Sequence, residues 1–268
     1  MNDRLRTAIA GFPRLEPGHV WLAGAGPGDP GLLTLHALAG LAEADIVVHD
    51  ALVDDRVLAL AHPGAKLEFV GKRGGKPSPS QTNITDRLIA LARANHRVLR
   101  LKGGDPCVFG RGGEEALALA AAGISFRIIP GVTSGLSALT VASIPATMRG
   151  ISQALILVTG HCGDEDDQVD WAALARIGQP MVLYMGLSNL DGIAAALISA
   201  GMDRHEPVAV IASATLPGER ILISELHRVA AETRELRFEA PAIIAIGAIV
   251  KVRAKLLDLA ARVPAMVA

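Results

Sequence analysis

The sequence has few aromatic residues and almost no net charge. Its 268 residues include only 2 Trp, 1 Tyr and 5 Phe. Sites that recognise single-stranded nucleic acid stack the bases on aromatic side chains, so this composition argues against such a function. The 26 Lys and Arg residues nearly balance the 27 Asp and Glu residues, giving a net charge of −1. No global basic field attracts a polyanion, so we expect no nucleic-acid partner and only local recognition of anions.

Cysteines and long apolar runs are equally scarce. The two cysteines, Cys107 and Cys162, lie far apart and form no CxxC motif. This pattern predicts neither a disulfide framework nor a zinc site, so we expect no bound metal and reduced thiols in a cytoplasmic protein. Glycine, proline or charged residues interrupt every apolar stretch before about 20 residues, and residues 1–13 lack the apolar core of a signal sequence. We therefore expect no membrane partner.

What the sequence has in abundance is aliphatic residues, since 50% of the chain is hydrophobic. This composition excludes a disordered chain. The length fits one large domain or two small ones at about 150 residues per domain. Short β-branched runs alternate with Ala- and Leu-rich amphipathic stretches, a pattern typical of parallel α/β architecture.

The pattern predicts two α/β halves. In the first half we expect strands at 20–23, 46–48, 67–70, 98–101 and 126–129, helices at 35–44, 86–94 and 114–121, and an irregular loop at 71–82. Thr34 is the expected N-cap of the first helix. In the second half we expect strands at 154–158, 181–184, 208–211, 221–223 and 243–246. The predicted division is an N-terminal extension at 1–18 and domains at 19–145 and 146–268.

The first strand leads into a glycine-rich loop, Gly24–Gly31, that allows three interpretations. A dinucleotide-binding fold needs G-x-G-x-x-G, but position 29 is Asp. The shorter G-x-G-x-G also occurs in Rossmann-like methyltransferases, and Asp50, at the end of the second strand, mimics the acid that binds a ribose. Against this second interpretation, Pro27 and Pro30 remove backbone N–H donors. The third interpretation is a turn that only the fold requires.

Two further loops follow predicted strands in the first half. In Lys102–Glu115, glycines allow a ligand to approach the backbone, Asp105 accepts from an ammonium or a hydroxyl, and Arg111 offers a planar fork to a carboxylate. The loop Pro130–Gly135 presents two hydroxyl groups beside glycines. Parallel α/β folds place ligands at such strand ends. Three loops of this kind make a purely structural explanation improbable and indicate a polar small-molecule ligand.

Together these segments resemble one family. The order GAGPGDPGLLTL, HDALV, GKRGGK, RLKGGDPCVFGRGGEE, PGVTSG, TGH, YMG, SATLPG and APAIIAIG is similar to the uroporphyrinogen-III C-methyltransferases of the tetrapyrrole methylase superfamily, from about Val20 to Val252. The resemblance implies a homodimer of two α/β domains, with S-adenosyl-L-methionine held in an interdomain active-site cleft. It also implies methylation of uroporphyrinogen III at C-2 and C-7, through precorrin-1 to precorrin-2, for cobalamin or sirohaem biosynthesis, with S-adenosyl-L-homocysteine as by-product.

The resemblance assigns roles to particular residues. The implied cofactor pocket consists of Pro27, Gly103, Gly104, Asp105, Val108, Thr133, Ser134, Met185, Ala214 and Ala242. In this family the proline lies against the cofactor, so its missing N–H is no defect. The implied catalytic residues are Asp50, Lys72, Arg111, Glu114 and Arg149.

The chemistry suggests how these catalytic residues divide the work. An electron-rich pyrrole carbon is already nucleophilic, so positioning should dominate over covalent catalysis. The methylated macrocycle must then lose a proton, which requires a base. Asp50 is the expected proton acceptor. Arg111 is the rival, but an arginine base needs unusual deprotonation, and we interpret Arg111 as a carboxylate clamp.

The sequence also departs from the family pattern and leaves other functions open. His49 replaces a common Tyr, Cys107 a common Phe, and Met148 a common His. The alternatives are a nicotinamide oxidoreductase that uses Gly24, Gly26 and Asp50, and a non-catalytic binder of a polycarboxylate. Methylases that act on later corrin intermediates are the nearest rivals of the same class.

Overall fold

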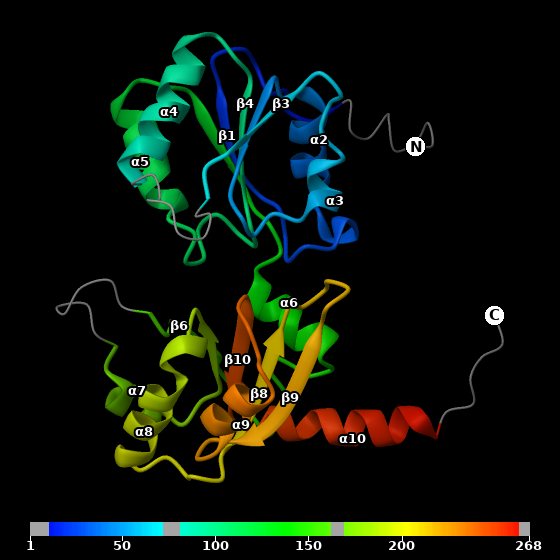
Figure 1. Cartoon of the computed structure of the whole chain (residues 1–268), viewed down its shortest axis with the longest axis vertical. Coiled ribbons are helices and arrows are strands. Elements are labelled where there is room, and N and C mark those ends of the chain that lie inside the picture. Colours follow the sequence, from blue (N-terminus) through cyan, green and yellow to red (C-terminus); the bar gives the residue numbers. More distant parts are fainter. Residues whose placement is uncertain (1–10, 72–80, 162–168, 263–268) are drawn as a thin grey trace. The chain divides into compact units, whose positions relative to one another are not determined.

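The structure is a computed structural model that describes residues 11–71, 81–161 and 169–262. The chain divides into two compact units, Met1–Ser134 and Gly135–Ala268. Each unit contains one five-stranded sheet with helices packed on it (Figure 1). The predicted class, two α/β halves, is confirmed. The units divide eleven residues before the predicted boundary at 145/146, because helix α6 (Ser134–Val141) begins at the junction and continues into the second unit.

The sheet of the first unit is entirely parallel, in the order β3-β2-β4-β1-β5. Its strands are β1 (Val20–Gly24), β2 (Ile46–His49), β3 (Lys66–Phe69), β4 (Val98–Lys102) and β5 (Phe126–Ile129). Its helices are η1 (Pro30–Leu32), α2 (Leu35–Glu43), α3 (Asp55–Leu58), α4 (Gln81–Arg93) and α5 (Gly112–Ala121). All five predicted strands and the three predicted helices are confirmed within a few residues. The helix predicted at 86–94 starts earlier, at Gln81, and residues 72–80 of the predicted loop lie outside the described residues.

Alternation along β1 explains why helices cover both faces of this sheet. Trp21 belongs to the core cluster that includes Leu41 of α2, whereas Leu22 belongs to the cluster with Leu119 of α5. Figure 1 shows α2 and α3 on one side of these strands and α4 and α5 on the other. Successive strand residues point to opposite faces, and a strand buried on both faces is apolar at every position. The aliphatic composition of the chain follows from this layering.

The second sheet is mixed, which corrects the expectation of parallel architecture for this half. Its order is β6-β7-β10-β8-β9, and only β6 and β7 pair in parallel. The strands are β6 (Ile156–Thr159), β7 (Met181–Tyr184), β8 (Pro207–Ala212), β9 (Arg220–Glu225) and β10 (Ala242–Ile246). β8 and β9 are joined without a helix, so they form an antiparallel pair. Strand spacing alone did not reveal this pairing.

Helices of the second unit also pack on its sheet. They are α7 (Trp171–Ile177), η3 (Leu187–Asn189), α8 (Leu190–Ser199), α9 (Val229–Glu235) and α10 (Val250–Ala261). Leu190 and Leu197 of α8 share a buried cluster with Leu183 and Ile244 of the sheet. Within the described residues, no helix is both long and apolar enough to cross a bilayer.

Candidate active site

The three glycine-rich loops of the first unit meet at the carboxyl edge of its sheet. Gly26 and Gly104 exchange backbone hydrogen bonds, with the Gly104 N–H donating to Gly26 O at 2.7 Å and the reverse bond at 3.2 Å. A Cβ on Gly131 would lie 2.2 Å from Gly104 O and 2.7 Å from Gly24 Cα. No side chain fits at that distance, so glycine is required for the loops to touch. The close approach explains Gly24 and Gly131, since a Cβ on either would collide with Gly104 O.

Asp105 joins two of these loops through its carboxylate. Its Oδ2 accepts from the Gly131 N–H at 3.0 Å, and its Oδ1 accepts from the Cys107 N–H at 2.8 Å. Ser134 Oγ lies 3.1 Å from where a Cβ on Gly104 would be. The structure thus brings Gly104, Asp105 and Ser134 close together. Carboxylate oxygens accept several hydrogen bonds each, so Asp105 retains capacity for an ammonium or hydroxyl ligand.

This loop cluster stands at a topological switch point. The helix after β1, α2, packs on one face of the sheet, and the helix after β4, α5, packs on the other. β1 and β4 are neighbours, so the chain leaves them in opposite directions at the Gly26–Gly104 contact. Open α/β sheets bind ligands at such points. The same geometry disfavours a dinucleotide-binding fold, in which the glycine-rich turn leads directly into the helix. Here residues 25–34 separate β1 from α2, and Thr34 Oγ1 accepts from the Ala37 N–H as the N-cap of that helix.

Five more predicted residues occupy this edge or its surroundings. Pro27 directly follows Gly26, which contacts Gly104. Gly103 packs against Leu52, because a Cβ added to Gly103 would lie 2.7 Å from the Cβ of Leu52. The Val108 N–H donates to Asp105 O at 3.4 Å, and Thr133 precedes the start of α6. Asp50 directly follows β2, next to β4 in the sheet. Lys72 lies outside the described residues.

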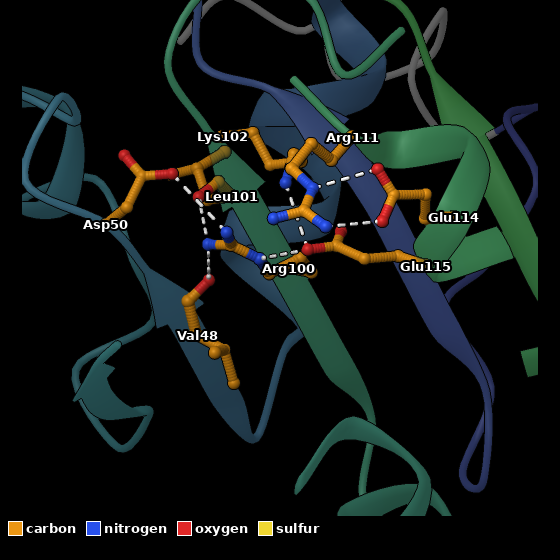
Figure 2. A network of polar contacts seen from close by, with 8 residues as sticks. All are labelled: Val48, Asp50, Arg100, Leu101, Lys102, Arg111, Glu114 and Glu115. Atoms are coloured by element: carbon orange, nitrogen blue, oxygen red, sulfur yellow. Dashed lines mark hydrogen bonds and ion pairs between the residues drawn. The ribbon is translucent and has the colours of Figure 1, made fainter. Parts of the chain in front are cut away.

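Arg111 and Glu114 form an exposed, two-pronged ion pair at the start of α5. Arg111 Nε and Nη2 donate to the two Glu114 oxygens at 2.8 and 2.6 Å (Figure 2). The hydrogen bond from Arg111 lowers the pKa of Glu114, and Glu114 in turn raises the pKa of Arg111 above its ordinary value. A guanidinium held in its charged form is a poor base, so the geometry favours Arg111 as an anion-binding group. Arg111 itself has a left-handed φ of 58°.

The remaining predicted residues belong to the second unit. Met185 follows β7, Ala214 follows β8, and Ala242 begins β10, which runs antiparallel to both. These three residues therefore lie at the same edge of the second sheet. Met185, Ser213 and Thr215 there have positive φ values of 54°, 50° and 68°. Non-glycine residues seldom adopt this conformation, and where they do they cluster at ligand sites.

Arg149 occupies a tight turn in the second unit. Met148 pairs with Ser152 in an isolated bridge, and the Met148 N–H donates to Ser152 Oγ at 3.2 Å. Arg149 is exposed at this turn. An exposed guanidinium is chemically suited to bind an anionic ligand.

A buried charge cluster beneath the loops was missed from the sequence. We define it as Asp50, Arg100, Lys102 and Glu115 (Figure 2). Glu115 is fully buried and contacts Arg100 Nε at 3.3 Å and Lys102 Nζ at 3.0 Å. Burial, followed by the charge of Arg100, lowers the pKa of Lys102, and Glu115 opposes this shift. The available signal was two cations at alternate positions of the otherwise apolar strand 98–102.

A second ionic group lies at the opposite edge of the second sheet. His205, Glu225 and His227 place possible ligand atoms within 4.8 Å of one another. The hydrogen bond from His205 lowers the pKa of Glu225, and Arg228 also lies 4.0 Å from its carboxylate. These contacts account for the half-buried Glu225 carboxylate as the acceptor of an ion-pair group.

The fold and the loop cluster thus define a two-unit α/β protein that binds a small polar ligand at a sheet edge. Comparison with known proteins identifies the family. The model of the Tetrapyrrole (Corrin/Porphyrin) Methylases matches residues 19–230. The chain belongs to this family.

Named relatives agree with this assignment. A Uroporphyrinogen-III C-methyltransferase from Sinorhizobium sp. is 51% identical over 250 residues, covering 92% of this chain and 89% of that protein. A Siroheme synthase from Zymomonas mobilis is 45% identical over 87% of this chain, which spans only 49% of that protein. A crystal structure of Uroporphyrin-III C-methyl transferase from Thermus thermophilus, complexed with S-adenyl homocysteine, matches with a TM-score of 0.76 and 40% identity, covering 87% of this chain and 99% of that one.

Proposed function

We propose that this chain methylates uroporphyrinogen III with S-adenosyl-L-methionine, forming precorrin-1 and then precorrin-2. The chain is a methyltransferase that uses S-adenosyl-L-methionine, and its product enters tetrapyrrole synthesis. The observation that carries the proposal is the convergence of the loops at Gly26, Gly104 and Gly131, two of which Asp105 joins. These loops lie within residues 19–230, which match the family model, and one relative named above was solved with S-adenyl homocysteine.

The loop cluster fits the co-substrate chemically. Asp105 offers carboxylate oxygens to an ammonium or to ribose hydroxyls, and the close backbone packing leaves no side chain between ligand and main chain. In the first unit, the residues that we assign to co-substrate binding are Pro27, Gly103, Gly104, Asp105, Val108, Thr133 and Ser134. In the second unit, we assign the same role to Met185, Ala214 and Ala242. The bound sulfonium supplies an electrophilic methyl group.

The protein's own residues position the substrate and accept a proton. The C–S bond breaks with its electron pair left on sulfur, a C–C bond forms to the macrocycle, and the methylated macrocycle loses one proton. We assign that proton to the carboxylate of Asp50. Arg111, Glu114, Arg149 and Lys72 orient the substrate, whose eight carboxylates suit fixed cations. A hydrogen bond to a charged group contributes about 1.5–3 kcal/mol.

The test is an anaerobic reaction of the purified chain with uroporphyrinogen III and S-adenosyl-L-methionine. We expect precorrin-2, recognised by its mass and absorption, and S-adenosyl-L-homocysteine in a 1:2 ratio. Absence of any methylated product contradicts the proposal. The Arg111→Ala variant should raise KM for uroporphyrinogen III at least about tenfold and leave KM for S-adenosyl-L-methionine nearly unchanged, as expected for loss of one charged contact.

Assembly and location complete the proposal. We assign the chain to the cytoplasm and to a homodimer. Light scattering on the purified protein tests the assembly, since a homodimer has twice the chain mass of 27.8 kDa. The product serves cobalamin or sirohaem biosynthesis, and deletion of the gene followed by supplementation with each end product distinguishes the two.

A further inference from the structure

The buried charge cluster holds four ionic groups, three of which are almost inaccessible to water. The side chains of Arg100 and Lys102 are 4% and 6% exposed, Glu115 is 0% exposed, and Asp50 is 25% exposed. Two cations and two carboxylates balance in charge. Buried charges persist only when they are paired and hydrogen-bonded, so each member depends on the others. Asp50 is the member with access to solvent.

Arg100 is the centre of the cluster because its guanidinium contacts three elements. Its Nε donates to Glu115 Oε1 on α5 at 3.3 Å, and its Nη2 lies 3.4 Å from Asp50 Oδ2 (Figure 2). Its Nη1 donates to the carbonyls of Val48 on β2 and Leu101 on β4, at 3.4 and 3.1 Å. A planar fork with this many contacts has little freedom. The position of Nη2 is therefore fixed by the sheet and by α5.

The Asp50 carboxylate is held from both sides. Oδ2 faces Arg100, and Oδ1 accepts from the Leu52 N–H at 3.0 Å. Glu115, which anchors Arg100, also binds Lys102, the residue just before the Gly103–Asp105 loop. One ionic cluster thus connects the proposed proton acceptor to the loop assigned to the co-substrate.

We infer that Arg100 is a positioning residue that fixes the carboxylate of Asp50 for proton transfer from the methylated macrocycle. This inference rests on the proposed function and on Asp50 as the proton acceptor. The proton moves from the macrocycle to a carboxylate oxygen of Asp50, while Arg100 keeps its proton and its charge throughout. Arg100 acts only by holding that oxygen in place, and misplacement of a catalytic group by about 1 Å can cost 100-fold in rate.

The chain offers a matched control at the other end of the same two strands. Arg97 precedes β4 and pairs with Asp45, which precedes β2, at 2.7 Å. Arg97→Lys and Arg100→Lys therefore make the same chemical change on the same strand pair. Lysine keeps the charge but loses the planar fork. We expect Arg100→Lys to lower kcat about 10- to 100-fold. KM for S-adenosyl-L-methionine and the affinity for S-adenosyl-L-homocysteine should stay within about twofold, and Arg97→Lys should leave all three within about twofold.

A double-mutant cycle with Asp50→Asn separates positioning from a general structural effect. If Arg100 acts through Asp50, Arg100→Lys should cause no further loss of kcat in the Asp50→Asn background. An equal loss in both backgrounds, or a matching loss of S-adenosyl-L-homocysteine affinity, overturns the inference.

Asp50→Glu is a second variant that leaves Arg100 and its burial intact. It moves the carboxylate by one methylene, so we expect kcat to fall about tenfold or more without loss of S-adenosyl-L-homocysteine binding. If Arg100→Lys does not fold, or if the turnover of Asp50→Asn is below detection, the Asp50→Glu variant is sufficient to test the inference. Wild-type kcat in Asp50→Glu overturns the inference. A wild-type chain that produces no methylated product instead contradicts the proposed function.

Discussion

At the scale of single residues, Glu115 is unusual because its one fully buried carboxylate pairs with two buried cations, Arg100 and Lys102. Its neighbour Glu114 also pairs with an arginine, but there both side chains are more than half exposed. Exposed ion pairs contribute little to stability, whereas loss of one partner from a buried pair leaves an uncompensated charge. Two adjacent glutamates in one helix turn therefore have different physical roles.

Glu115→Gln should lower the free energy of unfolding by about 3–5 kcal/mol, because Arg100 and Lys102 then share a buried site with no carboxylate between them. Glu114→Gln is the matched control and should cost less than about 1 kcal/mol. Urea unfolding followed by circular dichroism measures both. Equal destabilisation by the two variants contradicts the burial argument.

Lys102 gives the unfolding free energy a pH dependence whose sign follows from its pKa. Burial lowers the pKa of the folded Lys102 below its ordinary value of 10.5. Between the folded and ordinary values the unfolded chain binds more protons, so the contribution of this group to stability rises with pH in that window. The unfolding free energy of the wild type relative to Lys102→Met should therefore increase as the pH rises from the folded pKa of Lys102 towards 10.5. A flat or falling difference over this range is the contrary result.

Sequence reasoning located the residues at the loops but not the cluster beneath them. The loop glycines, Asp105 and Arg111 could be predicted from the sequence, because the chemistry of a loop depends on residues close together in the chain. Arg100, Lys102 and Glu115 could not, since their roles depend on β4 facing α5. Charges at alternate positions of an apolar strand predict a buried ionic partner. The identity of that partner, Glu115 and not Glu114, follows only from the helix orientation.

At the scale of elements, the loops after β1, β4 and β5 are fixed by backbone contact. The Gly131 position admits no Cβ, because Gly104 O would lie 2.2 Å away. The ten strand positions followed from hydrophobic patterning, since buried strands are short and aliphatic. The mixed pairing of the second sheet did not, because patterning reports burial and not strand direction.

Gly131→Ala should separate the loops, lower S-adenosyl-L-homocysteine affinity at least about tenfold and destabilise the fold by about 1–3 kcal/mol, as overpacking does. Gly113→Ala is the control, because nothing lies within 4 Å of a Cβ there and Gly113 is helical. Alanine in a helix is favoured over glycine, so that variant should be neutral or slightly stabilised. Calorimetric titration and thermal unfolding measure both effects. Tight ligand binding by Gly131→Ala would show that the contact does not shape the site.

At the scale of the whole molecule, a net charge of −1 coexists with exposed cations at the proposed substrate-binding positions Arg111 and Arg149. A substrate with eight carboxylates gains from these local charges, while the overall balance avoids attraction to other polyanions. The low aromatic content fits the same picture, because a flexible, charged macrocycle is held at its rim by cations and needs few stacking partners.

Salt should therefore weaken the binding of uroporphyrinogen III more than the binding of S-adenosyl-L-methionine. Raising ionic strength from about 0.05 M to about 0.5 M shortens the screening length severalfold, which weakens interactions between exposed charges. We expect KM for uroporphyrinogen III to rise several-fold over this range. S-adenosyl-L-methionine carries charges of both signs, so its KM should change much less. Arg111→Ala should reduce the salt dependence for uroporphyrinogen III, because one screened contact is already missing. Steady-state kinetics at fixed pH measures both KM values. An equal response of the two KM values to salt would mean that exposed cations do not dominate recognition of the macrocycle.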